Sequence, residues 1–332
     1  MSWFETLMGF REESPEQVRS QIAVDGHRMK SLVSGQEVLC GTLDTPTLSM
    51  LRRQVAETAE PAGTLRVSEI VANVQTLHCD SENSGALFQV ASQFNLLEMV
   101  SPSRTPEHGV GIYEDDRTQG PACAIAAGAG TIYRNYFAPV NGRIGQSVDN
   151  QIDCLQDVGK AIGNTDLRLW TMRNGYAMPS AAGLQEITDR LASINEQQLD
   201  FLRGTLRIGI QSDTQVTLGK CEHTVTQAYC SALPVAYCSH PSRLWALFAG
   251  LVLEAAYEAT FCAAVLNSAK TGNCRLFLTL LGGGAFGNET DWIYSAIERS
   301  LNLFSNRNLD VAIVSYGSSN PQVGSLIKRQ RR

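Results

Sequence analysis

The sequence predicts a three-layer α/β/α fold, in which a mixed, mostly parallel sheet lies between helices and a helical extension precedes it. Short apolar runs of strand length recur after residue 85, and they alternate with segments that have helical periodicity. Two of these runs, residues 275–281 and 309–315, are apolar on both faces. Strands of that kind are typical of a parallel sheet covered by helices on both sides.

The composition is that of a soluble globular protein with a large core. The chain has 332 residues, of which 43% are apolar and 18% charged. Its net charge of −6 provides no general positive field, so we expect no nucleic-acid partner. The only basic cluster, residues 328–332, is interpreted as a solvated tail rather than a nucleic-acid or localisation signal.

The cysteines and the apolar segments favour a cytoplasmic protein. The nine cysteines are odd in number and form no Cys-x-x-Cys pair, so we expect free thiols and no zinc site. The N-terminus has no basic segment followed by an apolar one, as a signal peptide would have. The longest apolar stretch, residues 244–265, contains Glu254 and Glu258 and therefore predicts a buried core helix rather than a membrane span.

Residues 1–75 read as mostly helical and polar. Ser14 followed by Pro15 is typical of a helix start, and residues 48–58 have amphipathic helical spacing. Because no low-complexity linker follows, we expect a helical accessory region, 1–75, packed on a core domain formed by residues 76–332.

Within the core the predicted elements follow one another in order. Strands are expected at residues 86–91, 167–171, 206–210, 275–281 and 309–315, with a mixed or extended segment at 227–237. Helices are expected at residues 120–136, 184–202, 241–268 and 291–304.

A glycine-rich loop between the strand 275–281 and the helix after it is the sharpest motif. It consists of Gly282, Gly283, Gly284, Ala285, Phe286, Gly287 and Asn288. Glycines let backbone N–H groups approach a phosphate, and the helix N-terminus adds partial positive charge. The loop lacks the Gly-Lys-Ser/Thr ending of a P-loop and the context of a dinucleotide fingerprint. A tight turn without a ligand is the alternative. Asn288 or Thr290 is expected to cap the helix.

At this loop the sequence resembles the macrodomain superfamily, in particular its poly(ADP-ribose) glycohydrolase-like branch. The resemblance implies that residues 282–288 wrap the diphosphate of ADP-ribose, with Phe286 near the distal ribose and Asn95 as the ribose-binding residue of an earlier loop. The signature of three glycines followed by Gln-Glu-Glu is absent. In its place residues 111–121 carry acids, a pattern that looks closer to hydrolases acting on ADP-ribosylated arginine, and the adenine contact has only Asp80 as a loose candidate.

Cleavage of a ribosyl bond needs an acid for the leaving group and a carboxylate for water. We expect Asp115 and Asp116 to act on the water and the leaving group, with Glu114 or Glu98 assisting, and Gln119 is available to orient a ribose or a water. Each has a plain alternative: the trio as a solvated turn before a helix, Glu98 as an exposed residue on one helical face, and Gln119 as a helix cap. His108, Tyr229, Cys230 and Ser231 are weaker candidates, and Trp292 and Tyr316 are expected to pack in the core rather than stack on adenine.

The function predicted from these features is an ADP-ribosyl hydrolase that removes ADP-ribose from protein side chains, with arginine linkage slightly preferred. Its partner is ADP-ribose or an ADP-ribosylated protein, and it needs no cofactor or metal. A non-catalytic ADP-ribose reader and an interaction protein with a vestigial loop are the alternatives. The oligomeric state and the modified partner stay open.

Overall fold

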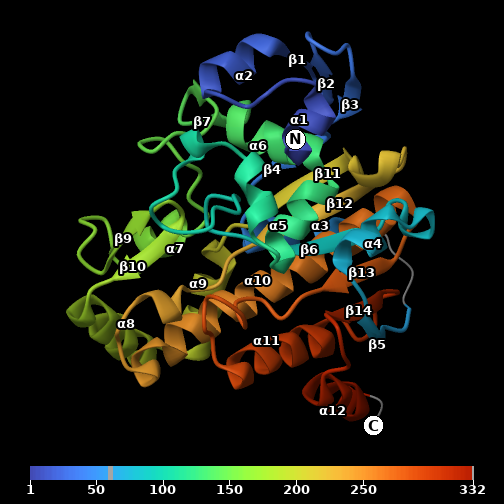
Figure 1. Ribbon diagram of the computed structural model, residues 1–332. Coiled ribbons are helices and arrows are strands. Elements are labelled where there is room, and N and C mark those ends of the chain that lie inside the picture. Colours follow the sequence, from blue (N-terminus) through green and yellow to red (C-terminus); the bar gives the residue numbers. More distant parts are fainter. Residues whose placement is uncertain (59–62, 331–332) are drawn as a thin grey trace.

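A computed structural model describes residues 1–58 and 63–330. Its largest sheet has seven strands and lies among the helices (Figure 1). The strand order is β4-β11-β12-β6-β13-β14-β5. The bounds of these strands, in sheet order, are Thr42–Asp44, Gly209–Gln215, Thr224–Cys230, Leu87–Ala91, Arg275–Leu278, Asp310–Ser315 and Arg66–Val71. The five neighbours from β12 to β5 run parallel, whereas β11 is antiparallel to both β4 and β12. The sheet is therefore mixed and mostly parallel, as predicted.

Helices cover both faces of this sheet. On one face the long helix α10 (Ser242–Thr271) packs against β6, β12 and β13. On the other face α5 (Gln119–Ala126) packs on β6 and α6 (Gly128–Tyr136) on β11. The alternation of side chains in β6 agrees, because Gln89 bonds to Thr260 of α10 while Phe88 stacks on His78 of α4 (Val74–Cys79). The predicted three-layer α/β/α fold is confirmed.

The face of α10 is completed by further helices, most of which Figure 1 shows in its lower half. These are α3 (Leu48–Glu57), α8 (Ala181–Ser193), α9 (Glu196–Thr205), α11 (Thr290–Leu303) and, beside β5, α12 (Pro321–Gln330). Eighty-three per cent of the most apolar window of α10 is buried inside the protein, which agrees with the predicted core helix. Arg331 and Arg332 of the predicted basic tail lie outside the described residues.

The first 75 residues contain more strand than the sequence indicates. After α1 (Trp3–Met8) and α2 (Pro15–Gln21), which Ser14 caps as predicted, come three strands that form a separate antiparallel sheet. They are β1 (Ile22–Asp25), β2 (Arg28–Ser31) and β3 (Glu37–Leu39). The strands β4 and β5 then form the two edges of the central sheet. The region is thus helical only in part. The sequence does not reveal these strands, because runs of three to six residues are too short for their periodicity to be recognised.

Three further segments differ from expectation. The helix expected at 120–136 breaks at Ala127 into α5 and α6. The helix expected at 184–202 breaks at Ile194, because Asn195 and Gln198 form a capping box that starts α9. The strand expected at 167–171 belongs to a hairpin of β9 and β10 outside the central sheet. The remaining short elements are β7 (Pro139–Val140), β8 (Arg143–Ile144), α7 (Gln156–Ala161), β9 (Trp170–Arg173) and β10 (Tyr176–Pro179).

Candidate active site

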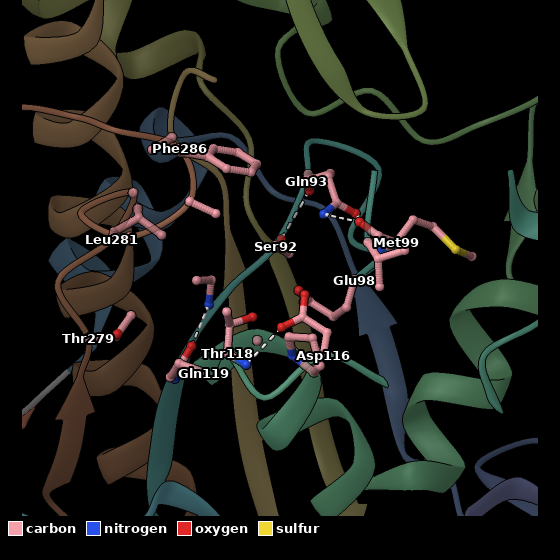
Figure 2. Close-up of a pocket in the computed structure, with 18 of the residues that line it drawn as sticks. Ser92, Gln93, Glu98, Met99, Asp116, Thr118, Gln119, Thr279, Leu281 and Phe286 are labelled. Atoms are coloured by element: carbon pink, nitrogen blue, oxygen red, sulfur yellow. Dashed lines mark hydrogen bonds between the residues drawn. The ribbon is translucent and has the colours of Figure 1, made fainter. Parts of the chain in front are cut away.

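A cavity of about 210 Å³ lies where β6 and β13 end, at the carboxyl edge of the parallel strands (Figure 2). This is the edge at which open α/β sheets bind ligands. Its walls come from the loop after β6, the start of α5, the hairpin strand β10, the loop after β12 and the glycine loop. The lining side chains with chemistry to offer are Ser92, Gln93, Glu98, Asp116, Thr118, Gln119, Tyr176, Tyr237, Thr279 and Phe286.

The loop after β6 is held by side chains rather than by regular structure. Gln93 accepts a hydrogen bond from the N–H of Met99 and donates one to the Met99 carbonyl. Asn95 is fully buried: its oxygen accepts the N–H of Leu97, and its amide donates to Gln151. Asn95 is not among the residues that line the cavity, so in this structure it shapes the loop instead of facing a ribose.

Glu98 is the acid that this loop places in the cavity wall. Its side chain is buried, and its Oε1 atom has no hydrogen-bond partner within the described residues. Burial raises the pKa of the carboxyl well above its ordinary value; Arg134 opposes this and the nearby Asp116 adds to it. A carboxyl group whose pKa is raised in this way keeps its proton to a higher pH than an ordinary glutamate does, and it can donate that proton to a bound substrate. The alternative, an exposed position on a helix, is wrong, since residues 92–99 are not helical and Glu98 is buried.

The start of α5 closes the cavity beneath Glu98. A Cβ atom on Gly120 would lie 2.2 Å from Glu98 Oε2 and 2.0 Å from the Ala91 carbonyl oxygen, so only glycine allows this approach. Gln119 lines the cavity, but its amide is engaged: its oxygen accepts the N–H of Ala91, and its nitrogen donates to the Gln89 carbonyl. The role of Gln119 in this structure is to fasten α5 to the end of β6.

The three adjacent acids point in different directions. Residues 111–115 form a 3-10 turn rather than an extended segment. Asp116 lines the cavity and accepts the N–H of Thr118, and Figure 2 shows it on the same side as Glu98. Glu114 instead accepts the backbone N–H of Trp3, while Asp115 is exposed and is not a lining residue. Of the four candidate acids, the fold brings together Glu98 and Asp116.

The glycine loop is open towards the cavity. Gly282, Gly284, Ala285 and Phe286 line it, whereas Gly283, Gly287 and Asn288 do not. Asn288 closes the loop, since its side chain donates to the Leu233 and Gly282 carbonyls and its N–H to Gly282 as well. Within the described residues the N–H groups of residues 284–286 donate to no protein atom. Three successive free amides can bind an anion.

The predicted helix cap at the end of this loop is wrong. The capping position of α11 is Glu289, which makes no side-chain bond there; Asn288 is used inside the loop and Thr290 is already helical. In the part of the chain that the structure describes, the capping residue therefore makes no side-chain hydrogen bond to the N-terminus of α11.

Aromatic side chains form the wall opposite the acids. Phe286 lies 5.4 Å from Tyr176 and 5.7 Å from Tyr237, measured between ring centroids. Figure 2 shows the Phe286 ring across the cavity from Glu98 and Asp116. Tyr176 and Tyr237 were not predicted, because no spacing in the sequence connects the β10 hairpin or the segment after β12 with the glycine loop.

A second cavity, of about 600 Å³, shares Asp116, Thr118, Gln119 and Thr279 with the first. Its rim carries Tyr316, a residue that directly follows β14 and is 83% exposed. The expectation that Tyr316 packs in the core is wrong, whereas Trp292 is half-buried against the core as expected. Asp80 lines neither cavity and caps the turn at residues 81–83.

The weaker candidates lie elsewhere. His108 bonds to Thr105 in its own turn, Cys230 contacts Thr260 inside the core, and Ser231 donates to the Ala232 carbonyl. In residues 1–58 and 63–330, no group of three His, Cys, Asp or Glu side chains is placed to hold a metal ion.

Comparisons with known proteins give structural similarities without close sequence relatives. No family model and no curated protein matches the chain. Among solved structures, poly(ADP-ribose) glycohydrolase from Thermomonospora curvata has a TM-score of 0.46 at 12% identity over 95% of each chain. The glycohydrolase from Deinococcus radiodurans, in complex with ADP-ribose, has a TM-score of 0.39 at 11% identity over 87% of this chain and 93% of that one. The chemistry of this protein must therefore be inferred from its own site.

Proposed function

We propose that this protein is an ADP-ribosyl hydrolase, which cleaves the glycosidic bond between ADP-ribose and a modified protein side chain. One observation carries the proposal: the same cavity holds Glu98, a buried acid whose Oε1 atom has no partner, and the three open amides of residues 284–286. Amides of that kind suit a diphosphate, and a protonated carboxyl group suits a glycosidic leaving atom.

The reaction assigns a separate task to each wall. Glu98 donates its proton to the atom that leaves the anomeric carbon, which weakens the bond as positive charge develops on the sugar. Asp116, as the second carboxylate, accepts a proton from the water that attacks this carbon. Phe286, with Tyr176 and Tyr237, supplies an apolar wall for the ribose and excludes bulk water from it.

The second cavity suits the adenosine half of the ligand. A cavity of about 210 Å³ holds a ribosyl group but not a dinucleotide-sized ligand, whereas pockets for such ligands measure roughly 300–1,000 Å³. The two cavities adjoin at four shared residues, and the exposed ring of Tyr316 offers a face on which a base can stack. Arginine as the linked side chain, and mono- rather than poly-ADP-ribose as substrate, remain predictions.

The test combines binding and turnover. ADP-ribose should raise the melting temperature of the protein more than AMP, NAD or ribose 5-phosphate at equal concentration. Proteins ADP-ribosylated on arginine or on acidic residues should release free ADP-ribose when the enzyme is added. A protein that binds ADP-ribose but releases nothing from either substrate is a reader, and a protein that binds none of these ligands contradicts both functions.

Replacing Tyr316 by Ala should weaken ADP-ribose binding by roughly fivefold, since loss of one stacking face costs about 1 kcal/mol. Calorimetry on ADP-ribose and on ribose 5-phosphate measures this effect. Binding of ribose 5-phosphate, which has no base, should not change. Tyr316→Phe keeps the ring and should keep the affinity; an equal loss for both ligands would place the base elsewhere.

Replacing Gly282 by Ala should reduce ADP-ribose affinity by tenfold or more. Gly282 has a φ of +75°, and a Cβ there would lie 2.5 Å from Ala232 Cβ and 2.7 Å from Asn288 Nδ2, so the loop must open. Gly272→Ala is the matched control. It has a φ of +77° but meets nothing within 4 Å, so it should cost about 1 kcal/mol of stability and leave binding unchanged. If the two variants bind ADP-ribose with equal affinity, the ligand does not bind at this loop.

A further inference from the structure

Arg134 is a buried cation behind the site that the proposed reaction does not use. Its side chain has no exposed surface, and within the described residues no carboxylate lies within ion-pair distance of it. It donates instead to three uncharged acceptors, the Leu96 carbonyl, Thr131 Oγ1 and Gln211 Oε1, and its Cζ lies 3.6 Å above the ring centre of Tyr229. Burial of a charge without a counter-ion is costly, so the position requires an explanation.

Arg134 contacts the loop that carries Glu98. Leu96 lies two residues before Glu98 and has a φ of +65°, a left-handed conformation that costs a leucine free energy. The Nε–H of Arg134 donates to the carbonyl of this residue at 3.1 Å. Gln146 supports the same arrangement, since its amide nitrogen donates both to the Asn95 carbonyl and to the Arg134 carbonyl. The guanidinium therefore fixes the strained turn from which Glu98 enters the cavity.

The positive charge of Arg134 also acts on the carboxyl group of Glu98. Burial raises the pKa of the Glu98 carboxyl, and the positive charge of Arg134 is the contribution that opposes the rise. Asp116, after the 3-10 turn, also raises the pKa of Glu98, and Glu98 in turn raises the pKa of four neighbouring groups: Tyr113 in that turn, Cys123 of α5, Tyr176 of β10 and Tyr229 of β12. None of these five groups carries positive charge. Arg134 thus favours the carboxylate form of Glu98, which is the form that proton transfer to the leaving atom leaves behind.

We propose that Arg134 is a positioning residue for Glu98: through Leu96 it holds the loop that presents the acid, and its buried charge stabilises the carboxylate that remains once the proton has been given away. The kinetic form of this inference rests on the proposed hydrolase function. The residue does not touch the substrate and acts only through Glu98.

The experiment compares Arg134→Met, Arg134→Lys and wild type by the pH dependence of kcat/KM on one ADP-ribosylated protein. Activity that needs protonated Glu98 is lost as the pH rises through the pKa of this group. Removal of the positive charge should move this alkaline limb upward by roughly one pH unit or more. Arg134→Lys keeps the charge, so its limb should stay at the wild-type pH while kcat falls because the bond to Leu96 is lost.

Arg203 provides the matched control, since it is also a buried arginine but is paired with Glu196 and Glu254 away from the site. Arg203→Met should lower stability without moving the alkaline limb. If Arg134→Met lowers kcat/KM with an unmoved limb, its role is structural only and the inference is overturned.

A second measurement needs no turnover and keeps the inference testable if the proposed function fails. The gain in unfolding free energy that Glu98→Gln gives over its parent should grow with pH and stop growing at the pKa of native Glu98. That plateau should begin at a higher pH in the Arg134→Met background than in the Arg134 background. Plateaus at the same pH would overturn the inference, whereas a wild type that releases no ADP-ribose while the plateaus differ would overturn only the hydrolase.

Discussion

Replacing Glu98 by Gln should lower kcat on ADP-ribosylated protein by about 10²–10⁴-fold, the range that a positioned general acid contributes. The amide has the same shape but cannot donate an acidic proton to the leaving atom. Binding of ADP-ribose should persist, because the open amides at residues 284–286 and the aromatic wall are unchanged. Single-turnover kinetics and calorimetry separate the two effects.

The same substitution should alter stability in the opposite direction. The native pKa of Glu98 is raised above its ordinary value of 4.5. Its contribution to stability is therefore fully present below the unfolded-state pKa and is lost as the pH rises through the native pKa. Gln stays neutral, so the melting temperature of the variant should exceed that of wild type increasingly from pH 5 upwards. A variant that loses activity and stability in parallel at all pH values would indicate a misfolded site.

Asp115→Asn is the control for the acid pair. Asp115 is adjacent to Asp116 in sequence but is exposed and outside the cavity, so its replacement should leave kcat and affinity close to wild type. Asp116→Asn should lower kcat if this carboxylate activates water. Equal losses for Asp115→Asn and Asp116→Asn would contradict the assignment.

Replacing Gly120 by Ala should abolish activity and lower the free energy of unfolding by about 1–3 kcal/mol or more, as overpacking of a tight contact does. The added methyl group would lie 2.0 Å from the Ala91 carbonyl and 2.2 Å from Glu98 Oε2, and the backbone of β6 cannot move away without breaking the Gln119 contacts. Equilibrium unfolding in urea and an activity assay measure the two losses.

Gly250→Ala makes the same change in a helix where nothing lies within 4 Å of the new atom. It should stabilise the protein by roughly 0.5–1 kcal/mol and leave activity unchanged, because alanine is the better helix former. A Gly120→Ala variant that retains both stability and activity would mean that α5 can shift and that its contact with Glu98 is not required.

Most of the fold could be predicted, since long periodic segments determine it. The strands β6, β13 and β14 and the helix α10 follow from apolar runs whose length and patterning suffice. The edge strands β4 and β5 could not be found, because three to six half-exposed residues give too little pattern. The division between α8 and α9 could have been found, since Asn195 and Gln198 have the spacing of a capping box.

Site residues that lie in one contiguous segment could be predicted from the sequence. Site residues that only the fold brings together could not. The glycine loop is contiguous, so its amides were identified from the sequence alone. The sequence indicates Glu98 as an assisting acid, but its burial depends on Tyr113, Arg134 and α5, which lie 15 to 36 residues further along the chain. Tyr176 and Tyr237 join the site only through tertiary packing, and no residue type or spacing announces that.

The pairing of β5 with β14 joins residues 66–71 to residues 310–315. During synthesis, β5 leaves the ribosome long before β14, the strand that will lie beside it, and its backbone lacks this partner until β14 has emerged. Contacts of such large sequence separation slow folding and lengthen the time in which other chains can add to an open edge. For this protein, the interval of exposure to aggregation is thus expected to run from the emergence of β5 until β14 has paired with it.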